Sequence, residues 1–416
     1  MEKVVIGGGQ GFWGDSNDAA VHMVKHGGLN YMACDYLAEL TLSIMARQKL
    51  KNPQAGYARD FIGLLSECIT NAQDNGVRIL SNAGGMNIEG CVNEIANIFR
   101  SKGLSGRKIG YVVGDDMTGE IDRMMAEGIT FDNIDGVGDF NEIKDKIVNA
   151  NVYYGHEPII ECLSGDADVI VTGRATDSAL FLSPLMYELG IKEDDWTNIA
   201  RGIMAGHLLE CGGQGAGGNF EYGWRDVPDM DQLGFPIAEF SMNDLIITKA
   251  PNCGGLITEQ SCKEQILYEI HNPASYVTPD VIADISKVTL TQVGKDRVAV
   301  DGIRGKKRPD TLKLSIGYHA GYKVAAMLSF AWPDAYEKAQ KAADILMKKM
   351  GRKNLKAEDI RIDYIGLNSL HLDIANMDPS HVKDLNEVVL RVAIRTKDKH
   401  EAEKIIPEIA PLQLNG

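Results

Sequence analysis

The sequence predicts an α/β fold: a mostly parallel, Rossmann-like sheet domain followed by a smaller α+β domain. Short apolar strands alternate with amphipathic helices over the first 250 residues, which is typical of a parallel sheet with helices on its faces. From about residue 275, runs of strands come before a helix, and that order favours a separate α+β domain. We therefore expect a glycine-rich α/β domain over residues 1–275, which carries the site, and a smaller domain over 276–416.

The strands expected in the first domain are short apolar runs that end at a polar residue or a glycine. They cover Val4–Gly7, Tyr31–Cys34, Arg78–Ser81, Lys108–Val113 and Val169–Thr172. The helices between them show apolar residues at helical spacing. They cover Asp18–Lys25, Tyr57–Asn75 and Glu89–Lys102.

The second domain is expected to be richer in strands. Its strands cover Val288–Val293, Val298–Ile303, Thr311–Tyr318, Tyr322–Ala331, Ile360–Gly366 and Val388–Thr396. Two helices are expected, over Pro333–Met350 and Lys399–Ile409. Gly351 follows the first of them directly and is expected to cap it.

Composition excludes several classes of protein. The chain has 58 Asp and Glu against 43 Lys and Arg, and its longest basic run is Lys306–Arg308, which argues against binding to nucleic acid. The apolar stretches are far shorter than the ~20 residues that span a bilayer, so no membrane association is expected. A strand begins almost at the N-terminus, and the seven cysteines form no CxxC pair. These features favour a cytoplasmic protein with reduced thiols, and we expect a homo-oligomer.

The candidate site lies where polar residues follow the strands, because open parallel sheets bind ligands just past the carboxyl ends of their strands. Arg174, Asp177 and Ser178 follow the fifth strand in a turn that a glycine opens. The guanidinium of Arg174 matches a carboxylate, Asp177 is in reach of a substrate proton, and Ser178 offers a donor to an oxyanion. The alternative is a structural Arg–Asp pair at the start of the next helix.

Glu210 and Cys211 lie beside the densest glycine cluster of the chain, residues 212–218. A carboxylate beside free backbone N–H groups is a reasonable general base. Cys211 requires a lowered pKa to act as a nucleophile, and His207, four residues earlier, is the candidate that would supply it. The alternative is that both side chains pack on one face of a helix.

Four further residues follow the second and third strands. Asp35 and Glu39 are four apart and share a face if a helix begins there, so they are candidates for acid/base chemistry or for a divalent ion such as Mg²⁺. The alternative is that Asp35 caps the helix and Glu39 pairs with a nearby base. Asn82 and Asn87 flank two glycines, and they either stabilise a turn or donate to a ligand carbonyl or carboxylate.

The turn after the first strand, Gly9-x-Gly11-x-x-Gly14, matches a dinucleotide fingerprint and leaves an NAD(P)-dependent oxidoreductase open as an alternative function. Trp13 puts a bulky side chain where the backbone would approach a pyrophosphate. Asp15 stands at the helix entrance, where it would repel an anion. The other interpretation is that Asp15 caps the helix.

These segments as a set resemble the acyclic terpene utilisation family AtuA. The resemblance rests on Gly11–Ala20, Asp35–Thr41, Ser81–Asn87, Gly173–Ala179, Gly206–Gln214, Gln265–Ile270 and Tyr276–Asp284. It implies carboxylic-acid catabolism and a hydroxy-acid or acyl-thioester substrate. Longer members resemble this chain with a C-terminal ferredoxin-like domain added, which implies a small accessory subunit of that fold for the present chain.

The leading hypothesis is a lyase of the hydratase or dehydratase type, acting on a small branched hydroxycarboxylic acid or its acyl thioester. Arg174 binds the substrate carboxylate, Glu210 or Asp177 transfers the proton, and Asn82 with the backbone of 212–218 supports the oxyanion. Asp35 and Cys211 complete the candidate catalytic set. Candidate substrate-binding residues are Gly11, Asp15, Glu39, Asn82, Asn87, Ser178, Gly212, Gly213 and Gln214. Besides the oxidoreductase, a non-catalytic, ligand-binding subunit of a two-component enzyme is the alternative.

Overall fold

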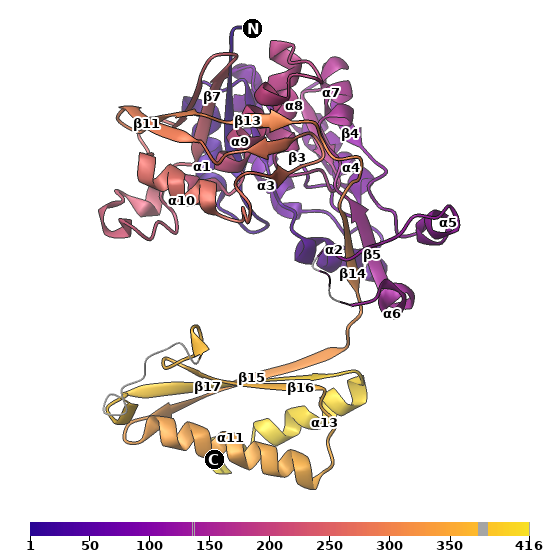
Figure 1. Ribbon diagram of the computed structural model, residues 1–416, viewed down its shortest axis with the longest axis vertical. Helices are drawn as coiled ribbons and strands as arrows, with labels where there is room; N and C mark the ends of the chain where they lie inside the picture. The colour runs from indigo at the N-terminus through magenta and orange to yellow at the C-terminus, as the bar shows by residue number, and fades with distance from the viewer. Residues whose placement is uncertain (135, 137, 373–381, 416) are drawn as a thin grey trace. The chain divides into compact units, whose positions relative to one another are not determined.

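A computed structural model describes residues 1–134, 136, 138–372 and 382–415 (Figure 1). By its internal contacts the chain divides into two units, Met1–Tyr318 and His319–Gly416. The division expected at 275/276 therefore falls later, because the strands just after residue 275 pack within the first unit.

A nine-stranded mixed sheet forms the centre of the first unit, and five neighbouring strands of it run parallel. In spatial order these are β1 (Lys3–Gln10), β2 (Tyr31–Cys34), β3 (Arg78–Ser81), β6 (Val169–Thr172) and β4 (Ile109–Val112). All five strands expected in the first half of the sequence are confirmed. Their order differs from the 3-2-1-4-5-6 order of a dinucleotide-binding Rossmann sheet.

Four antiparallel strands extend the sheet beyond β1. They are β7 (Pro236–Ser241), β8 (Leu245–Lys249), β12 (Arg297–Asp301) and β11 (Thr289–Gly294). The strands β11 and β12 were expected in the smaller domain. The correction has a simple cause: a local pattern identifies a strand, but the pairing of Val298 with Ile247 joins segments far apart in the sequence.

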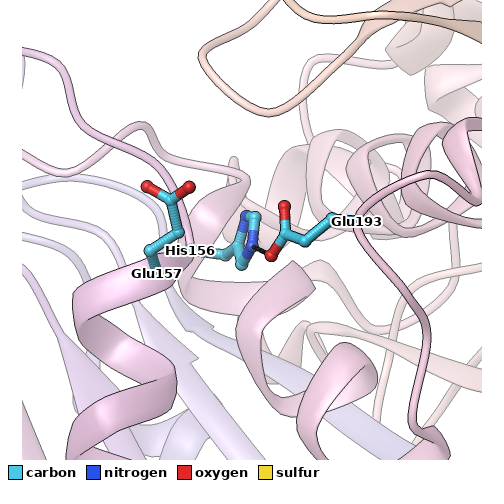
Figure 2. Close-up of side chains that lie close together, drawn as sticks. All are labelled: His156, Glu157 and Glu193. Carbon is cyan, nitrogen blue, oxygen red and sulfur yellow. Dashed lines mark hydrogen bonds and ion pairs between the residues drawn. The ribbon is translucent and has the colours of Figure 1, made fainter.

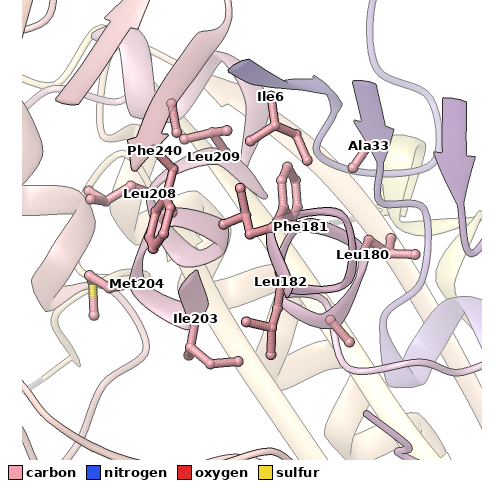
Figure 3. Packing of buried hydrophobic residues seen from close by; sticks show 14 of the residues in the cluster. Ile6, Ala33, Leu180, Phe181, Leu182, Ile203, Met204, Leu208, Leu209 and Phe240 are labelled. Atoms are coloured by element: carbon pink, nitrogen blue, oxygen red, sulfur yellow. The ribbon is translucent and has the colours of Figure 1, made fainter. Parts of the chain in front are cut away.

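Helices cover both faces of the parallel half, because the strand residues are apolar on both sides. Met32, Ile79 and Val171 face one core, which is completed by α1 (Asn17–His26), α3 (Arg59–Asp74) and α4 (Ile88–Ser101). Ile6 and Ala33 face the other core. There α8 (Ala179–Leu189) and α9 (Trp196–Leu209) bury side chains such as Phe181 against the sheet (Figure 3). Among the described residues, no helix is long and apolar enough to cross a membrane.

Smaller elements surround this sheet. A two-stranded pair joins β5 (Ile147–Val152) to β14 (Leu314–Tyr318), and a three-stranded sheet joins β9 (Tyr276–Val277), β10 (Ile282–Asp284) and β13 (Arg304–Lys306). The remaining elements of this unit include α2 (Glu39–Lys51), α5 (Ile121–Ala126), α7 (Glu157–Ser164), α10 (Glu259–Leu267) and a 3-10 helix over Gly212–Ala216.

The second unit is a three-stranded antiparallel sheet with its own core. The chain order is β15 (Tyr322–Ala331), α11 (Ala335–Arg352), β16 (Asp359–Ile365), β17 (Glu387–Thr396) and α13 (Lys399–Ile409). Among the described residues, this β-α-β-β-α succession matches the first five elements of a ferredoxin-like β-α-β-β-α-β unit. Gly351 lies inside α11 and does not cap it: the left-handed residue that follows the helix is Asn354, with φ of 51°.

Candidate functional site

The carboxyl ends of β2, β3 and β6 bring three of the predicted polar residues into one buried cluster. Asn82 donates from Nδ2 to Asp35 Oδ1 at 2.5 Å and accepts from the N–H of Tyr36 at 2.7 Å. The N–H of Leu37 also donates to Asp35 Oδ1. Burial raises the pKa of Asp35, although the charge of Arg174 and these hydrogen bonds oppose the shift. Asn82 thus holds Asp35 through its side-chain nitrogen, and its side-chain oxygen is occupied by the N–H of Tyr36.

Arg174 is 1% exposed, and its guanidinium already has protein partners. It donates to the carbonyl of Leu37 and to the carboxylate of Asp177, and its central carbon lies 4.2 Å from the centre of the Tyr153 ring. The N–H of Arg174 donates to Asp115, which burial keeps at a raised pKa. The ion pair with Asp177 is thus the structural alternative that the sequence left open.

The loop from 174 to 178 also contains polar atoms that need a partner. Among the described residues, none bonds to Arg174 Nε, Thr176 Oγ1 or Ser178 Oγ, and all three atoms are buried. Buried polar groups are nearly always satisfied in native proteins, by water or a ligand where the protein offers nothing. The loop therefore retains donors for a bound group even though the ends of the Arg174 fork are occupied.

Glu210 and His207 form a buried pair that shares a proton. His207 Nε2 lies 2.8 Å from the carbonyl oxygen of Gln265, which can only accept, so Nε2 carries a hydrogen. Nδ1 lies 2.9 Å from Glu210 Oε1, and one proton serves both atoms. Burial raises the pKa of Glu210, and the charge of Asp35 adds to the rise. Burial opposes a charge on His207, but Glu210 raises its pKa nevertheless.

Cys211 does not meet the condition set for a nucleophile. Burial, followed by the charge of Glu210, raises its pKa to about 12. His207 does not lower that pKa, because its Nδ1 hydrogen-bonds to Glu210 instead. The thiol is therefore protonated at neutral pH and serves as part of the wall of a cavity.

Asp35 and Glu39 do not share a helix face, which corrects the pairing expected from their spacing. Asp35 lies in the turn before α2, and the helix begins only at Glu39. Glu39 Oε1 accepts from the hydroxyl of Tyr153 at 2.6 Å and from Lys313 Nζ at 3.1 Å. Burial would raise the pKa of Glu39, but these two donors lower it to about 2. Each carboxylate thus has its own set of partners.

Asn87 is structural and lies at the start of α4. Its Oδ1 accepts from the N–H of Gly90 at 3.1 Å, and its Nδ2 donates to the carbonyls of Pro53 and Ala55. Asn87 therefore caps the helix, and only Asn82 of the two predicted asparagines belongs to the cluster.

An open cavity of about 710 Å³ has Cys211, the chain neighbour of Glu210, in its wall, whereas Asp35, Arg174 and Glu210 are not among the residues that line it. Of the predicted residues, Gly11, Asp15, Cys211, Gly213 and Gln214 line it. The remaining predicted glycine, at position 212, lies next to this wall in a left-handed turn with φ of 54°.

Amide side chains connect the cavity wall to the buried pair. Gln214 donates to Gln265 Oε1 at 3.0 Å, and Gln265 donates in turn to the carbonyl of His207 at 3.0 Å. Sequence reasoning missed Gln265, Tyr153 and Lys313 as site residues, because each belongs to a segment that only tertiary folding brings here. The only signal for Gln265 was its place in a segment that carries the family resemblance.

The glycines at the end of β1 and just after it pack closely against other segments of the chain, so their small size does not require a bound phosphate. A side-chain carbon at Gly11 would lie 2.5 Å from the carbonyl carbon of Cys211, and one at Gly9 would lie 2.7 Å from the sulfur of Met32. Asp15 bonds the N–H groups of Gly11 and Ser16, and burial raises its pKa. Ser16, and not Asp15, is the N-cap of α1. The glycines that match a dinucleotide fingerprint are thus explained by close packing against Met32 and Cys211.

A second group of titratable residues lies at the start of α7, apart from these predictions. Ligand atoms of His156, Glu157 and Glu193 lie within 4.8 Å of one another (Figure 2). Both ring nitrogens of His156 are occupied, Nδ1 by Asp280 at 2.6 Å and Nε2 by Glu193 at 2.8 Å. Glu157 pairs with Arg308 at 2.7 Å. We interpret the group as an ion-pair network.

Comparison with known proteins gives one match. The model of the family described as "Acyclic terpene utilisation family protein AtuA" matches residues 4–416. No curated protein and no solved structure matches the chain.

Proposed function

The chain belongs to the acyclic terpene utilisation family AtuA, and from this premise we propose that it is a lyase of the hydratase or dehydratase type. Its substrate is a small branched hydroxycarboxylic acid or the acyl thioester of one. The observation that supports the proposal most is the pair His207–Glu210, which shares one proton in a buried position next to Asp35. Carboxyl groups with raised pKa values, gathered beside a cavity, are what acid/base catalysis requires.

In the proposed reaction Glu210 removes the proton next to the carboxyl or thioester carbonyl. It does so in the state in which the shared proton resides on His207, so that Glu210 is a carboxylate. Asp35 is held by Asn82 and carries a raised pKa. It donates a proton to the hydroxyl group that leaves as water. The carbon–hydrogen and carbon–oxygen bonds break, a double bond forms, and no other reactant is needed.

The loop from 174 to 178 binds the negative charge of the substrate in this scheme. Arg174 Nε and Ser178 Oγ are buried donors that find no partner among the described residues, and a carboxylate or an enolate oxygen would satisfy them. Asp177 keeps the guanidinium of Arg174 in place. The sequence predicted that the two terminal nitrogens of Arg174 bind the substrate carboxylate. In this scheme those nitrogens bond Leu37 and Asp177, and Arg174 donates to the substrate from Nε instead.

The test is turnover of a panel of small branched hydroxy acids and their coenzyme A thioesters, followed by the absorbance of the conjugated double bond. We expect Glu210→Gln to lower kcat by about 10²–10⁴. We expect Arg174→Ala to lower kcat/KM as well. Glu127→Gln, at the exposed residue just after α5, makes the same chemical change away from the site and should leave turnover intact.

Wild-type turnover by both site variants would contradict the proposal. The wild-type protein is also assayed with Mg²⁺, with a co-encoded small subunit, and by NAD(P)H fluorescence. Activity only with the small subunit would favour a ligand-binding subunit of a two-component enzyme. A change of nicotinamide fluorescence would favour the oxidoreductase.

A further inference from the structure

The cavity that Cys211 and Gln214 line has an unusual charge for a protein expected to bind carboxylates. Among the residues that the structure describes, those that line it include three aspartates, Asp15, Asp18 and Asp231, and neither a lysine nor an arginine. Asp18 and Asp231 are exposed at its opening. A cleft lined by charge of one sign concentrates its field and repels ligands of the same sign.

Lys249, which bonds a residue of the cavity wall, does not offset this charge. Lys249 lies behind Cys253, a residue of the cavity wall, and its side chain is only 8% exposed. Its ammonium donates to the carbonyl of Cys253 at 2.9 Å and lies 3.6 Å from Asp296. Lys249 is therefore compensated on its own side of the wall. In the described part of the chain, an anion in the cavity would meet carboxylates with no lysine or arginine in the wall to balance them, and His22 is the one wall residue that can take up a positive charge.

The rest of the wall suits an apolar group with a polar end. Phe12, Met230, Leu233 and Phe235 line the cavity, and Phe12 is 59% exposed to it and to solvent. Side-chain amides, including that of Gln214, supply neutral hydrogen-bonding groups. Apolar surface with a few polar groups that set the orientation is the usual composition of a small-molecule site.

We propose that this cavity admits a branched apolar group whose polar end is cationic or uncharged, and that it excludes the anionic form of the same molecule. Under the proposed function, the anionic end of the substrate is then held by the loop 174–178, whose residues do not line the cavity, and not by the cavity wall. This orientation rests on the proposed function. The charge preference of the cavity rests only on its wall.

The test compares three molecules with the same branched skeleton: 3-methylbutylamine, 3-methylbutan-1-ol and 3-methylbutanoate. Their binding to the full-length protein is measured by ligand-observed NMR titration at pH 8, where histidines are ordinarily uncharged. We expect the ammonium ion to bind at least as well as the alcohol. We expect the carboxylate to bind roughly tenfold more weakly or worse, because close like charges are costly outside bulk water.

Two variants locate the effect in the cavity. Phe12→Ala should weaken the binding of all three molecules. Asp231→Lys should reduce or reverse the preference for the ammonium ion, whereas Asp74→Lys, the same change on the exposed end of α3, should leave the order unchanged. Both lysine variants change exposed residues, so neither is expected to impair folding.

Equal binding of the carboxylate and the alcohol to the wild-type protein would overturn the inference, and so would the absence of binding by all three. An unchanged order in Asp231→Lys would overturn it as well. The order of affinity for the three molecules should persist in Glu210→Gln. Loss or retention of turnover in that variant bears on the proposed function alone, so the two failures are distinguishable.

Discussion

At the scale of single residues, His156 illustrates how burial and charge are balanced in this protein. Its side chain and that of Asp280 are each 1% exposed, and their atoms Nδ1 and Oδ1 lie 2.6 Å apart. Burial alone would lower the pKa of His156, but Asp280 and then Glu193 outweigh it and raise the pKa to about 9. The imidazolium therefore persists at neutral pH as the partner of a buried carboxylate.

Replacing His156 by Gln should destabilise the protein in a pH-dependent manner. The pKa of histidine in an unfolded chain is about 6.5, so the raised folded value stabilises the protein fully below that pH. The stabilisation disappears as the pH rises through about 9. The shift corresponds to about 3 kcal/mol. Thermal unfolding of wild type and His156→Gln should differ most at pH 6 and least at pH 10, and a constant difference would contradict this account.

The residues of the buried cluster show what a residue type alone can indicate. An arginine in a glycine-led turn and acids after strands suggested chemistry, and the structure places Arg174, Asp35 and Glu210 in buried positions with polar partners. Their partners were not predictable. Tyr153 stacks on Arg174, and Gln265 fixes the tautomer of His207, and both come from segments remote in sequence.

At the scale of elements, β1 and the end of α9 approach each other backbone to backbone. A side-chain carbon at Gly8 would lie 2.3 Å from the carbonyl oxygen of Leu209. Gly11, three residues on, lies in the same way against the backbone of Cys211. These contacts position Glu210 and the loop after it relative to the parallel sheet. The glycine excess of this region therefore reflects close packing of chain segments.

Gly8→Ala should separate these elements and destabilise the protein by about 1–3 kcal/mol, the usual cost of overpacking. Gly63→Ala in α3 is the matched control. Its added carbon would meet nothing closer than 4.0 Å, and removing a helical glycine should stabilise by about 0.5–1 kcal/mol. Chemical denaturation measures both values. Equal effects of the two substitutions would show that crowding against Leu209 is not the cause.

At the scale of the whole molecule, the chain has separate cores on either side of residue 318. The two clusters of the first unit end at Ile303, and the cluster of the second unit begins at Val324. All the predicted site residues lie in Met1–Tyr318. Each unit therefore has the buried apolar surface that independent folding requires.

Residues 1–318 expressed alone should fold and keep the His156-dependent pH profile of stability. Calorimetry of the full chain should show two transitions. Leu346→Ala, in the core of the second unit, should lower only one of them, and its partly exposed neighbour Met347 provides the control substitution to Ala. An unfolded fragment, or one transition that moves as a whole, would contradict independent units.

The sequence by itself determined the elements that local patterns specify. Apolar periodicity and turn residues located the strands β1, β2, β3, β4 and β6 and the helices α1, α3 and α4, and the ordered set of motifs identified the family. It also indicated that the carboxyl ends of the parallel strands carry polar residues. These properties depend on neighbours within a few positions, so they can be read from a single chain.

Only the tertiary structure decided which elements pair and which polar groups remain without partners. The addition of β11 and β12 to the large sheet, the shared proton of His207 and Glu210, and the negative charge of the cavity wall all depend on contacts between distant segments. Local composition carries no information on such contacts. A hydrogen bond or a charge acts over a few ångströms of space, and folding alone sets that distance for residues far apart in the chain.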